Sequence, residues 1–229
     1  MTAPRALLVD YGMGNLRSLA RALERAGAEV SVSADPADIA AADRVVVPGQ
    51  GAFGQAMARL ESTGQADALR AAIAAGRPML GVCLGLQVLF EASEEAPGVP
   101  GLGVFEGQVT LLPVGPGLKR PHMGWSPVLH AGDHPVLAAN PSGEAFYFVH
   151  SYAAHGAPGV PHATAHHGPV LGSRASGAVP PLSAGLRPAA HSVCEFVAAV
   201  ARGPLVATQY HPEKSQEAGH RLLTAWLGL

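Results

Sequence analysis

The sequence predicts an α/β fold, in which a doubly wound, mostly parallel sheet carries helices on both faces. Over the first ninety residues, short apolar runs alternate with segments whose apolar residues repeat at helical spacing, which is the pattern of consecutive βαβ units. Hydrophobic residues make up 48% of the 229 residues and charged residues only 14%, so the chain has the apolar content of a large packed core. We therefore expect residues 1–229 to form a single domain.

The first half of the chain alternates predicted strands with predicted helices. Asn15 can cap the first helix, while Gly27 and Gly76 mark the ends of the first and third. The fourth helix begins directly after the fourth strand, so the chain must turn sharply between them. Short apolar runs bounded by turn residues predict strands at 6–9, 29–32, 44–47 and 79–82, and apolar residues at helical spacing predict helices at 16–26, 53–60, 66–75 and 84–90.

The second half of the chain contains more proline and glycine. Residues 94–103 are predicted to form a loop, and Ser215 can cap a final helix over 216–227. The segment from Gly168 to His191 contains four prolines and no sustained periodicity, which predicts an inserted surface loop. Apolar runs predict strands at 108–112, 145–150, 196–200 and 205–209.

Charge and hydropathy exclude several classes of protein. A net charge of −2 gives no electrostatic basis for binding nucleic acid or an anionic membrane surface. No apolar run approaches the ~18 residues of a membrane span, and the start of the chain lacks the pattern of a signal peptide. We therefore expect a cytoplasmic location, where thiols stay reduced. The two cysteines, Cys83 and Cys194, are too few for a disulfide framework.

Cys83 lies where the buried fourth strand is predicted to turn into a helix, within Gly81-Val82-Cys83-Leu84-Gly85. This is a cysteine version of the nucleophile elbow, whose glycines permit a strained turn that exposes the central side chain at the carboxyl edge of the sheet. A helix N-terminus behind the sulfur favours thiolate over thiol, and the backbone N–H of Leu84 can stabilise an oxyanion. The alternative is a buried cysteine that serves as a small apolar side chain. Cys194 lacks flanking glycines and precedes a predicted strand, which indicates a packing role.

A thiol nucleophile needs a base, and the base needs a residue that orients it. Tyr210-His211-Pro212-Glu213 follows the predicted strand at 205–209. In an extended segment, residues two apart face the same side, so Glu213 can hold the ring of His211. By itself this pair is more typical of a surface histidine and a solvated carboxylate. Together with Cys83, the two residues supply the nucleophile, base and orienting group of a catalytic triad.

Two other features point to chemistry less strongly. Gly12-Met13-Gly14 resembles the start of a dinucleotide-binding loop, but Arg17 stands where the third glycine is needed. His162, His166 and His167 lie close together in sequence without a nearby cysteine or carboxylate. This composition favours solvated histidines over a metal site.

The chain resembles the class I, or triad, glutamine amidotransferases through Gly81-Val82-Cys83-Leu84-Gly85-Leu86-Gln87 and His211-Pro212-Glu213-Lys214-Ser215. More narrowly, it is similar to the glutaminase subunits of imidazole glycerol phosphate synthases. The six motifs together follow the order of that family across nearly the whole chain. The narrower resemblance is carried by Asp10-Tyr11-Gly12-Met13-Gly14-Asn15-Leu16-Arg17-Ser18, Pro48-Gly49-Gln50-Gly51-Ala52-Phe53-Gly54, Pro121-His122-Met123-Gly124-Trp125 and Phe146-Tyr147-Phe148-Val149-His150-Ser151-Tyr152.

The resemblance implies hydrolysis of the L-glutamine side-chain amide to glutamate and ammonia by Cys83, His211 and Glu213. It places backbone groups of Leu84 and of residues 49–51 in the oxyanion hole. The implied partner is a (β/α)8-barrel cyclase subunit in a heterodimer, which uses the ammonia to make imidazole glycerol phosphate and an aminoimidazole carboxamide ribotide in histidine biosynthesis. No metal and no organic cofactor are implied. The implied substrate contacts are Gly51, Leu84, Gln87, His150, Ser151 and Tyr152.

Two departures from the family pattern leave alternatives open. Gln50 stands where these glutaminases commonly have valine, on the strand of the oxyanion hole, and the segment 168–191 has no counterpart of its length. One alternative is another class I enzyme, such as the glutaminase of pyridoxal phosphate synthase or a cobyric acid type amidotransferase, against which the motifs at 10–18 and 121–125 argue. The other is a non-catalytic binding subunit on the same scaffold, against which the intact triad argues.

Overall fold

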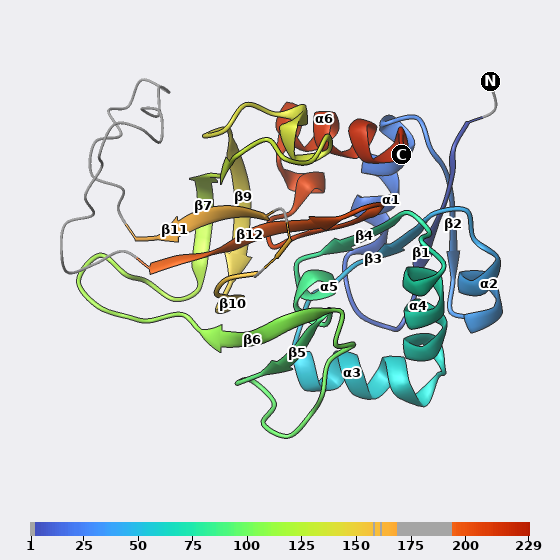
Figure 1. Cartoon of the computed structure of the whole chain (residues 1–229), viewed down its shortest axis with the longest axis horizontal. Helices are drawn as coiled ribbons and strands as arrows, with labels where there is room; N and C mark the ends of the chain where they lie inside the picture. The colour runs from blue at the N-terminus through green and yellow to red at the C-terminus, as the bar shows by residue number, and fades with distance from the viewer. Residues whose placement is uncertain (1–2, 158, 161, 169–193) are drawn as a thin grey trace.

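The computed structural model describes residues 3–157, 159–160, 162–168 and 194–229. In this part of the chain the centre is an eight-stranded sheet with the order β2-β1-β3-β4-β13-β12-β11-β8 (Figure 1). The first five strands in this order run parallel, and β12, β11 and β8 extend the sheet antiparallel at one edge. The strands are β1 (Arg5–Val9), β2 (Glu29–Ser33), β3 (Val45–Val47), β4 (Met79–Val82), β8 (Leu129–His130), β11 (His162–His167), β12 (Cys194–Arg202) and β13 (Leu205–Thr208).

Helices cover both faces of this sheet (Figure 1). Successive side chains of a buried strand point to opposite faces, so each strand supplies both layers of the core. In β1, Leu8 packs in the same cluster as Leu23, whereas Leu7 packs in the cluster of Leu69. The predicted α/β fold is therefore confirmed. The first face carries α1 (Leu16–Arg25) and α6 (Gln216–Leu227), and the second carries α2 (Pro36–Ala41), α3 (Phe53–Ser62) and α4 (Gln65–Ala74).

Short polar side chains start the first two helices. The side chain of Asn15 accepts a hydrogen bond from the backbone N–H of Ser18 at 3.2 Å, which confirms the predicted cap of α1. Asp35 accepts from the backbone N–H of Ala37 at 2.8 Å, and proline occupies the first position of α2. The sequence does not predict α2, because this helix has only six residues and Ile39 is its one buried side chain.

The helix predicted at 84–90 is wrong beyond its first turn. α5 (Leu84–Gln87) is a single turn, and the chain continues into the strand β5 (Phe90–Ser93). Backbone hydrogen bonds from a distant segment cause the change: Leu102 N donates to Val88 O at 2.7 Å, and Val104 N donates to Leu89 O at 2.8 Å. Tertiary pairing therefore overrides the local helical spacing.

The second half of the chain builds two small sheets beside the large one (Figure 1). β6 (Phe105–Leu111) pairs with β5 and with β10 (Tyr152–Ala154), while β7 (His122–Pro127) and β9 (Ala145–His150) form an antiparallel ribbon. The sequence does not predict β7, β8, β10 or β11, which are short or contain glycine, proline and histidine. The predicted surface insertion at 168–191 lies outside the described residues, apart from Gly168.

The expectation of three solvated histidines on β11 is wrong for His167. This side chain is buried, its Nδ1 lies 3.2 Å from Nδ1 of His122, and its Nε2 lies 3.0 Å from the carbonyl oxygen of Pro113. The cause is the strand alternation along β11, which leaves His162 exposed and His166 partly buried. Cys194 is half-buried and is the first residue of β12, so the strand predicted at 196–200 begins earlier than expected and includes Cys194.

In the described part of the chain, every helix is too short or too polar to cross a membrane.

Candidate active site

Cys83 occupies a tight turn between β4 and α5. Its φ of 55° and ψ of −105° lie outside the regions that non-glycine residues prefer, and its backbone N–H donates to the carbonyl oxygen of Thr208 at 2.7 Å. The flanking positions must be glycine because other backbone segments pack too closely against them to leave room for a side chain. A Cβ atom on Gly81 would lie 2.7 Å from Gly85 O, and one on Gly85 would overlap Val47 O. These contacts give the geometry that the elbow motif predicts.

The helix behind Cys83 is shorter than the sequence predicts. α5 has four residues, and Leu86 N and Gln87 N both donate to the carbonyl oxygen of Cys83, at 3.0 and 3.2 Å. A helix dipole sums over aligned peptide units, so one turn contributes much less than a full helix. Stabilisation of a thiolate at Cys83 must therefore depend mainly on other groups.

His211 and Glu213 form a buried pair next to this turn. Nδ1 of His211 lies 2.8 Å from Oε1 of Glu213, with only 2% and 3% of the two side chains exposed. The chain folds into a 3-10 turn, η2 (Pro212–Lys214), immediately after His211. The two residues therefore meet through this turn, and the extended geometry expected from the sequence is wrong.

The backbone of His211 is anchored on both sides. Its N–H donates to Tyr147 O of β9 at 2.9 Å, and the hydroxyl of Ser215 donates to its carbonyl oxygen at 2.7 Å. The same hydroxyl accepts from Tyr147 N at 3.0 Å. Ser215 makes no side-chain cap for α6, so its predicted capping role is wrong. Its hydroxyl instead links the backbone of His211 to Tyr147 of β9.

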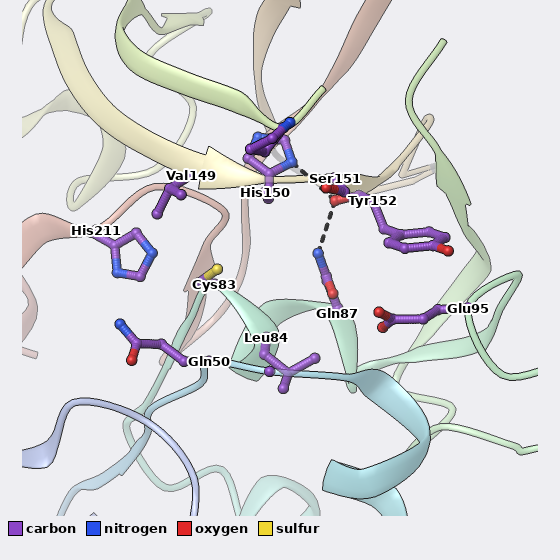
Figure 2. Close-up of a pocket in the computed structure, with 12 residues that line it drawn as sticks. Gln50, Cys83, Leu84, Gln87, Glu95, Val149, His150, Ser151, Tyr152 and His211 are labelled. Carbon is purple, nitrogen blue, oxygen red and sulfur yellow. Dashed lines mark hydrogen bonds between the residues drawn. The ribbon is translucent and has the colours of Figure 1, made fainter. Parts of the chain in front are cut away.

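The environment of His211 favours its charged form. Burial acts to lower the pKa of the imidazole, but Cys83 and Glu213 act in the opposite direction and raise this pKa to about 9. Nε2 of His211 has no hydrogen-bond partner in the described ranges, and His211 and Cys83 line the same cavity (Figure 2). An imidazolium in this position is the counterion that a cysteine thiolate needs.

A cavity of about 350 Å³ opens in front of Cys83 and His211 (Figure 2). All six residues that the sequence predicts as substrate contacts line it, and Glu213 lies behind His211, outside the cavity wall. The structure thus brings together residues that lie far apart in the sequence, from Gln50 to His211. The full lining is Gln50, Gly51, Cys83, Leu84, Gln87, Glu95, Pro121, Val149, His150, Ser151, Tyr152 and His211.

The ring of His150 packs among aromatic side chains. Its centroid lies 4.9 Å from that of Phe196 and 5.4 Å from that of His122, and its Nδ1 donates to Tyr152 O at 2.9 Å. Burial and the nearby His122 lower the pKa of His150 to about 3, so the ring is neutral. The packed ring leaves the backbone as the part of His150 best suited to contact a ligand.

Glu95 is a cavity residue that the sequence does not single out. It lies in the predicted loop at 94–103, and its Oε2 accepts a hydrogen bond from Phe53 N at the start of α3, at 2.7 Å. In Figure 2 its carboxylate lies beside Gln87 and Tyr152, at the other end of the cavity from Cys83 and His211. Nothing in the local sequence distinguishes Glu95 from its neighbour Glu94, because the pairing of α3 with this loop is a tertiary contact.

Comparison with known proteins assigns the family. The sequence profile of the glutamine amidotransferase class-I family matches residues 7–227. The chain belongs to the class I glutamine amidotransferase family. It is 44% identical to the imidazole glycerol phosphate synthase subunit HisH of Synechococcus sp. (strain JA-3-3Ab), covering 97% of this chain and 93% of that protein. It is 41% identical to the HisH subunit of Symbiobacterium thermophilum, over 97% and 92% of the two chains.

Within this amidotransferase family the chain belongs to the HisH group, which confirms the narrower resemblance. A crystal structure of a glutamine amidotransferase superposes with a TM-score of 0.67 at 19% identity, covering 97% of this chain and 99% of that one. That likeness concerns the fold alone.

The amidotransferase elbow is packed directly against the segment that follows β3. A Cβ atom on Gly49 would lie 2.6 Å from Gly85 N, and Gly51 has a φ of +105°. The hydroxyl of Tyr11 donates to Pro48 O at 2.6 Å and fixes the start of this segment. Gln50, where the resemblance leads us to expect valine, lines the cavity on the side of Cys83 and His211 (Figure 2).

Proposed function

We propose that the chain hydrolyses the side-chain amide of L-glutamine as the glutaminase subunit of an imidazole glycerol phosphate synthase, in histidine biosynthesis. The observation that carries the proposal is the meeting of Cys83 with the buried His211–Glu213 pair on one cavity of a class I amidotransferase. Cys83 and His211 line the same cavity and Glu213 holds Nδ1 of His211, which supports the roles of nucleophile, base and orienting group.

The reaction has two halves. The Cys83 thiolate attacks the amide carbon of glutamine, and the oxyanion is stabilised by backbone N–H groups of Leu84 and of residues 49–51. Imidazolium at His211 donates its Nε2 proton to the departing ammonia, which leaves a glutamyl thioester on the sulfur. Neutral His211 then removes a proton from water, whose oxygen attacks the thioester and releases glutamate. Glu213 fixes the orientation and tautomer of the imidazole throughout.

The opposite end of the cavity suits the amino-acid end of glutamine. Glu95 is the carboxylate of the cavity lining and provides a counterion for the α-ammonium group. Backbone N–H groups of Ser151 and Tyr152 are assigned to the α-carboxylate, and Gln87 lies between the two ends (Figure 2). A substrate bound in this direction extends its side-chain amide toward Cys83.

We assign the face beside His211 to the (β/α)8-barrel cyclase partner, in a heterodimer. Met123 and Trp125 of β7 are 67% and 48% exposed, which is unusual for large apolar side chains. The ring of Trp125 contacts that of Tyr147, and Nζ of Lys214 lies 5.7 Å from the centroid of Tyr147. Because Tyr147 O also binds His211 N, this face adjoins the catalytic residues and gives ammonia a short path to a partner. We place the reaction in the cytoplasm, where a reactive thiol stays reduced.

The test is a synthase assay of the chain together with its cyclase partner. Glutamine should support turnover of the wild-type complex. Cys83→Ala should abolish glutamine-supported turnover and leave turnover on ammonium salts largely intact, because free ammonia needs no thiol. Glutamine-supported turnover by Cys83→Ala would disprove the proposal.

A genetic test addresses the pathway. The gene should restore growth without histidine to a deletion strain that lacks its HisH subunit, and the Cys83→Ala gene should not. Growth restored equally by both genes would show that the triad is not the source of the activity.

A further inference from the structure

Gln209 is a fully buried amide that touches the nucleophile. It follows β13, and its backbone N–H donates to Ala198 O at 2.7 Å. Its side chain extends toward the elbow, where Nε2 lies 3.6 Å from Sγ of Cys83. The triad mechanism described above does not use this contact.

The orientation of the Gln209 amide is fixed by its neighbours. Nε2 of Gln87 donates to two oxygens, the carbonyl of Tyr152 at 2.9 Å and Oε1 of Gln209 at 3.1 Å. The backbone carbonyl of Tyr152 can only accept a hydrogen bond, so it fixes the orientation of the Gln87 amide, whose nitrogen donates and cannot accept. Oε1 of Gln209 must then face Gln87, which turns its Nε2–H toward the sulfur.

A thiolate at Cys83 has few other groups that could stabilise it, so the N–H donor of Gln209 matters. The residue is 7% exposed, so water gives a thiolate little solvation, and α5 is only one turn long. Among the described residues, the ionisable groups that interact electrostatically with Cys83 are His211, which Glu213 holds, and Tyr11. The Tyr11 hydroxyl donates to Pro48 O, and burial together with the charge of Cys83 raises its pKa, so this group stays neutral. Gln209 therefore supplies a neutral donor whose strength does not change with pH.

We propose that Gln209 stabilises the reactive form of Cys83 by donating an Nε2–H hydrogen bond to the thiolate sulfur. The inference rests on the proposed role of Cys83 as the nucleophile. A hydrogen bond to a charged acceptor is roughly twice as strong as one to a neutral acceptor, so the contact favours thiolate over thiol. A series of hydrogen bonds from Tyr152 O through Gln87 to Gln209 also connects the sulfur to the cavity wall that receives the substrate.

The test measures the ionisation of the thiol directly. In a Cys194→Ser background, in which Cys83 is the remaining cysteine, the rate of alkylation by iodoacetamide is followed against pH. Its midpoint reports formation of the thiolate–imidazolium pair. Gln209→Met keeps the length of the side chain and removes the N–H donor. We expect it to raise the midpoint by about one to two pH units, because a hydrogen bond to a charged group is lost.

Thr208→Val is the matched control. The Thr208 hydroxyl is fully buried one residue away, donates to Tyr210 O at 2.9 Å and does not contact the sulfur. Its loss should lower stability and leave the alkylation midpoint unchanged. A folded Gln209→Met protein with the midpoint of its parent would overturn the proposal.

A second measurement needs no substitution at Gln209. In the parent protein labelled with ¹⁵N, the side-chain amide protons of Gln209 should shift with the same midpoint as alkylation, and should not do so in Cys83→Ala. Amide protons that ignore ionisation of the thiol would contradict the hydrogen bond even if Gln209→Met does not fold. Both measurements omit glutamine, so a negative result here leaves the proposed function standing, whereas glutamine turnover by Cys83→Ala would refute that function.

Discussion

His211 and His150 are both buried in the wall of one cavity, with 2% and 6% of their surfaces exposed, yet their environments drive them to opposite charge states. The pKa of His211 is raised to about 9, while that of His150 is lowered to about 3. Burial acts to lower the pKa in both cases. The difference comes from the partners.

His211 has a carboxylate at 2.8 Å and a cysteine sulfur nearby, so its positive charge is compensated. His150 has aromatic rings and a backbone carbonyl, which provide no full negative charge. Burial therefore sets the free-energy cost of a charge, and the neighbouring side chains decide whether the charge forms. One region of the cavity is therefore suited to proton transfer, and the other to holding the backbone in place.

The largest effect is expected for His211→Asn. This substitution removes the proposed catalytic base, and glutaminase turnover of the complex should fall by about 10³-fold or more. Turnover on ammonium salts should remain, which serves as the control for folding and association. Equal glutamine-dependent rates for His211→Asn and wild type would end the assignment.

Acid should destabilise the protein through His150. In the unfolded chain this histidine titrates near its ordinary value of 6.5, so below that pH the unfolded state binds more protons than the folded state. The contribution of a neutral His150 is complete above pH 6.5 and is lost as the pH falls toward 3. It should cost about 3 kcal/mol of unfolding free energy at pH 4.

Urea unfolding at pH 7, 5 and 4 measures this acid dependence. His150→Gln can keep the hydrogen bond to Tyr152 O and should flatten the dependence, whereas His162→Gln, at an exposed position of β11, should not change it. Identical acid curves for the two variants would show that His150 is not the source. His211 acts in the opposite direction, since its contribution is complete below pH 6.5 and is lost as the pH rises through about 9.

Glu213→Gln should make His211 more like His150. Without the carboxylate the imidazolium loses its charged partner, and its pKa should fall. Turnover should decrease by about 10²-fold, less than for His211→Asn, because in the proposed mechanism Glu213 orients the base and transfers no proton. The pH profile of glutamate release separates this effect from a loss of folding, because the limb that reports the imidazolium should move to lower pH.

The smallest effect is expected for His150→Gln on catalysis. The ring packs against Phe196 and His122, so glutaminase activity at pH 7.5 should stay within about threefold of wild type. A decrease as large as that of Glu213→Gln would show that the imidazole takes part in the reaction, and the comparison would then fail.

The parallel half of the fold is the part that can be predicted best from the sequence. In β1 to β4 and α1 to α4, buried runs and capping residues are local signals, and all except α2 can be predicted. The proposed triad can also be predicted from the sequence, because Gly81, Cys83 and Gly85 form a motif at close spacing, as do His211 and Glu213.

The remaining features depend on contacts between distant segments. Pairing with residues 101–104 ends α5 after one turn, and His167 is buried where its side chain contacts His122 and Pro113. Glu95 enters the cavity because α3 begins against it, and Gln209 reaches Cys83 because β13 lies beside β4. No local pattern distinguishes these residues from their neighbours in the sequence.

The glycines of the elbow have a consequence for how this amidotransferase can evolve. Side chains on Gly49, Gly81 and Gly85 would meet backbone atoms of one another or of β3, and a backbone cannot move aside as a flexible side chain can. A second mutation elsewhere therefore has little means of restoring a variant at any of the three. Random mutation at these codons should be almost uniformly deleterious, whereas the side chain of Gln50 lines the open cavity and should tolerate replacement. Deep mutational scanning should find the sharpest contrast in tolerance between adjacent positions at Gly49 and Gln50.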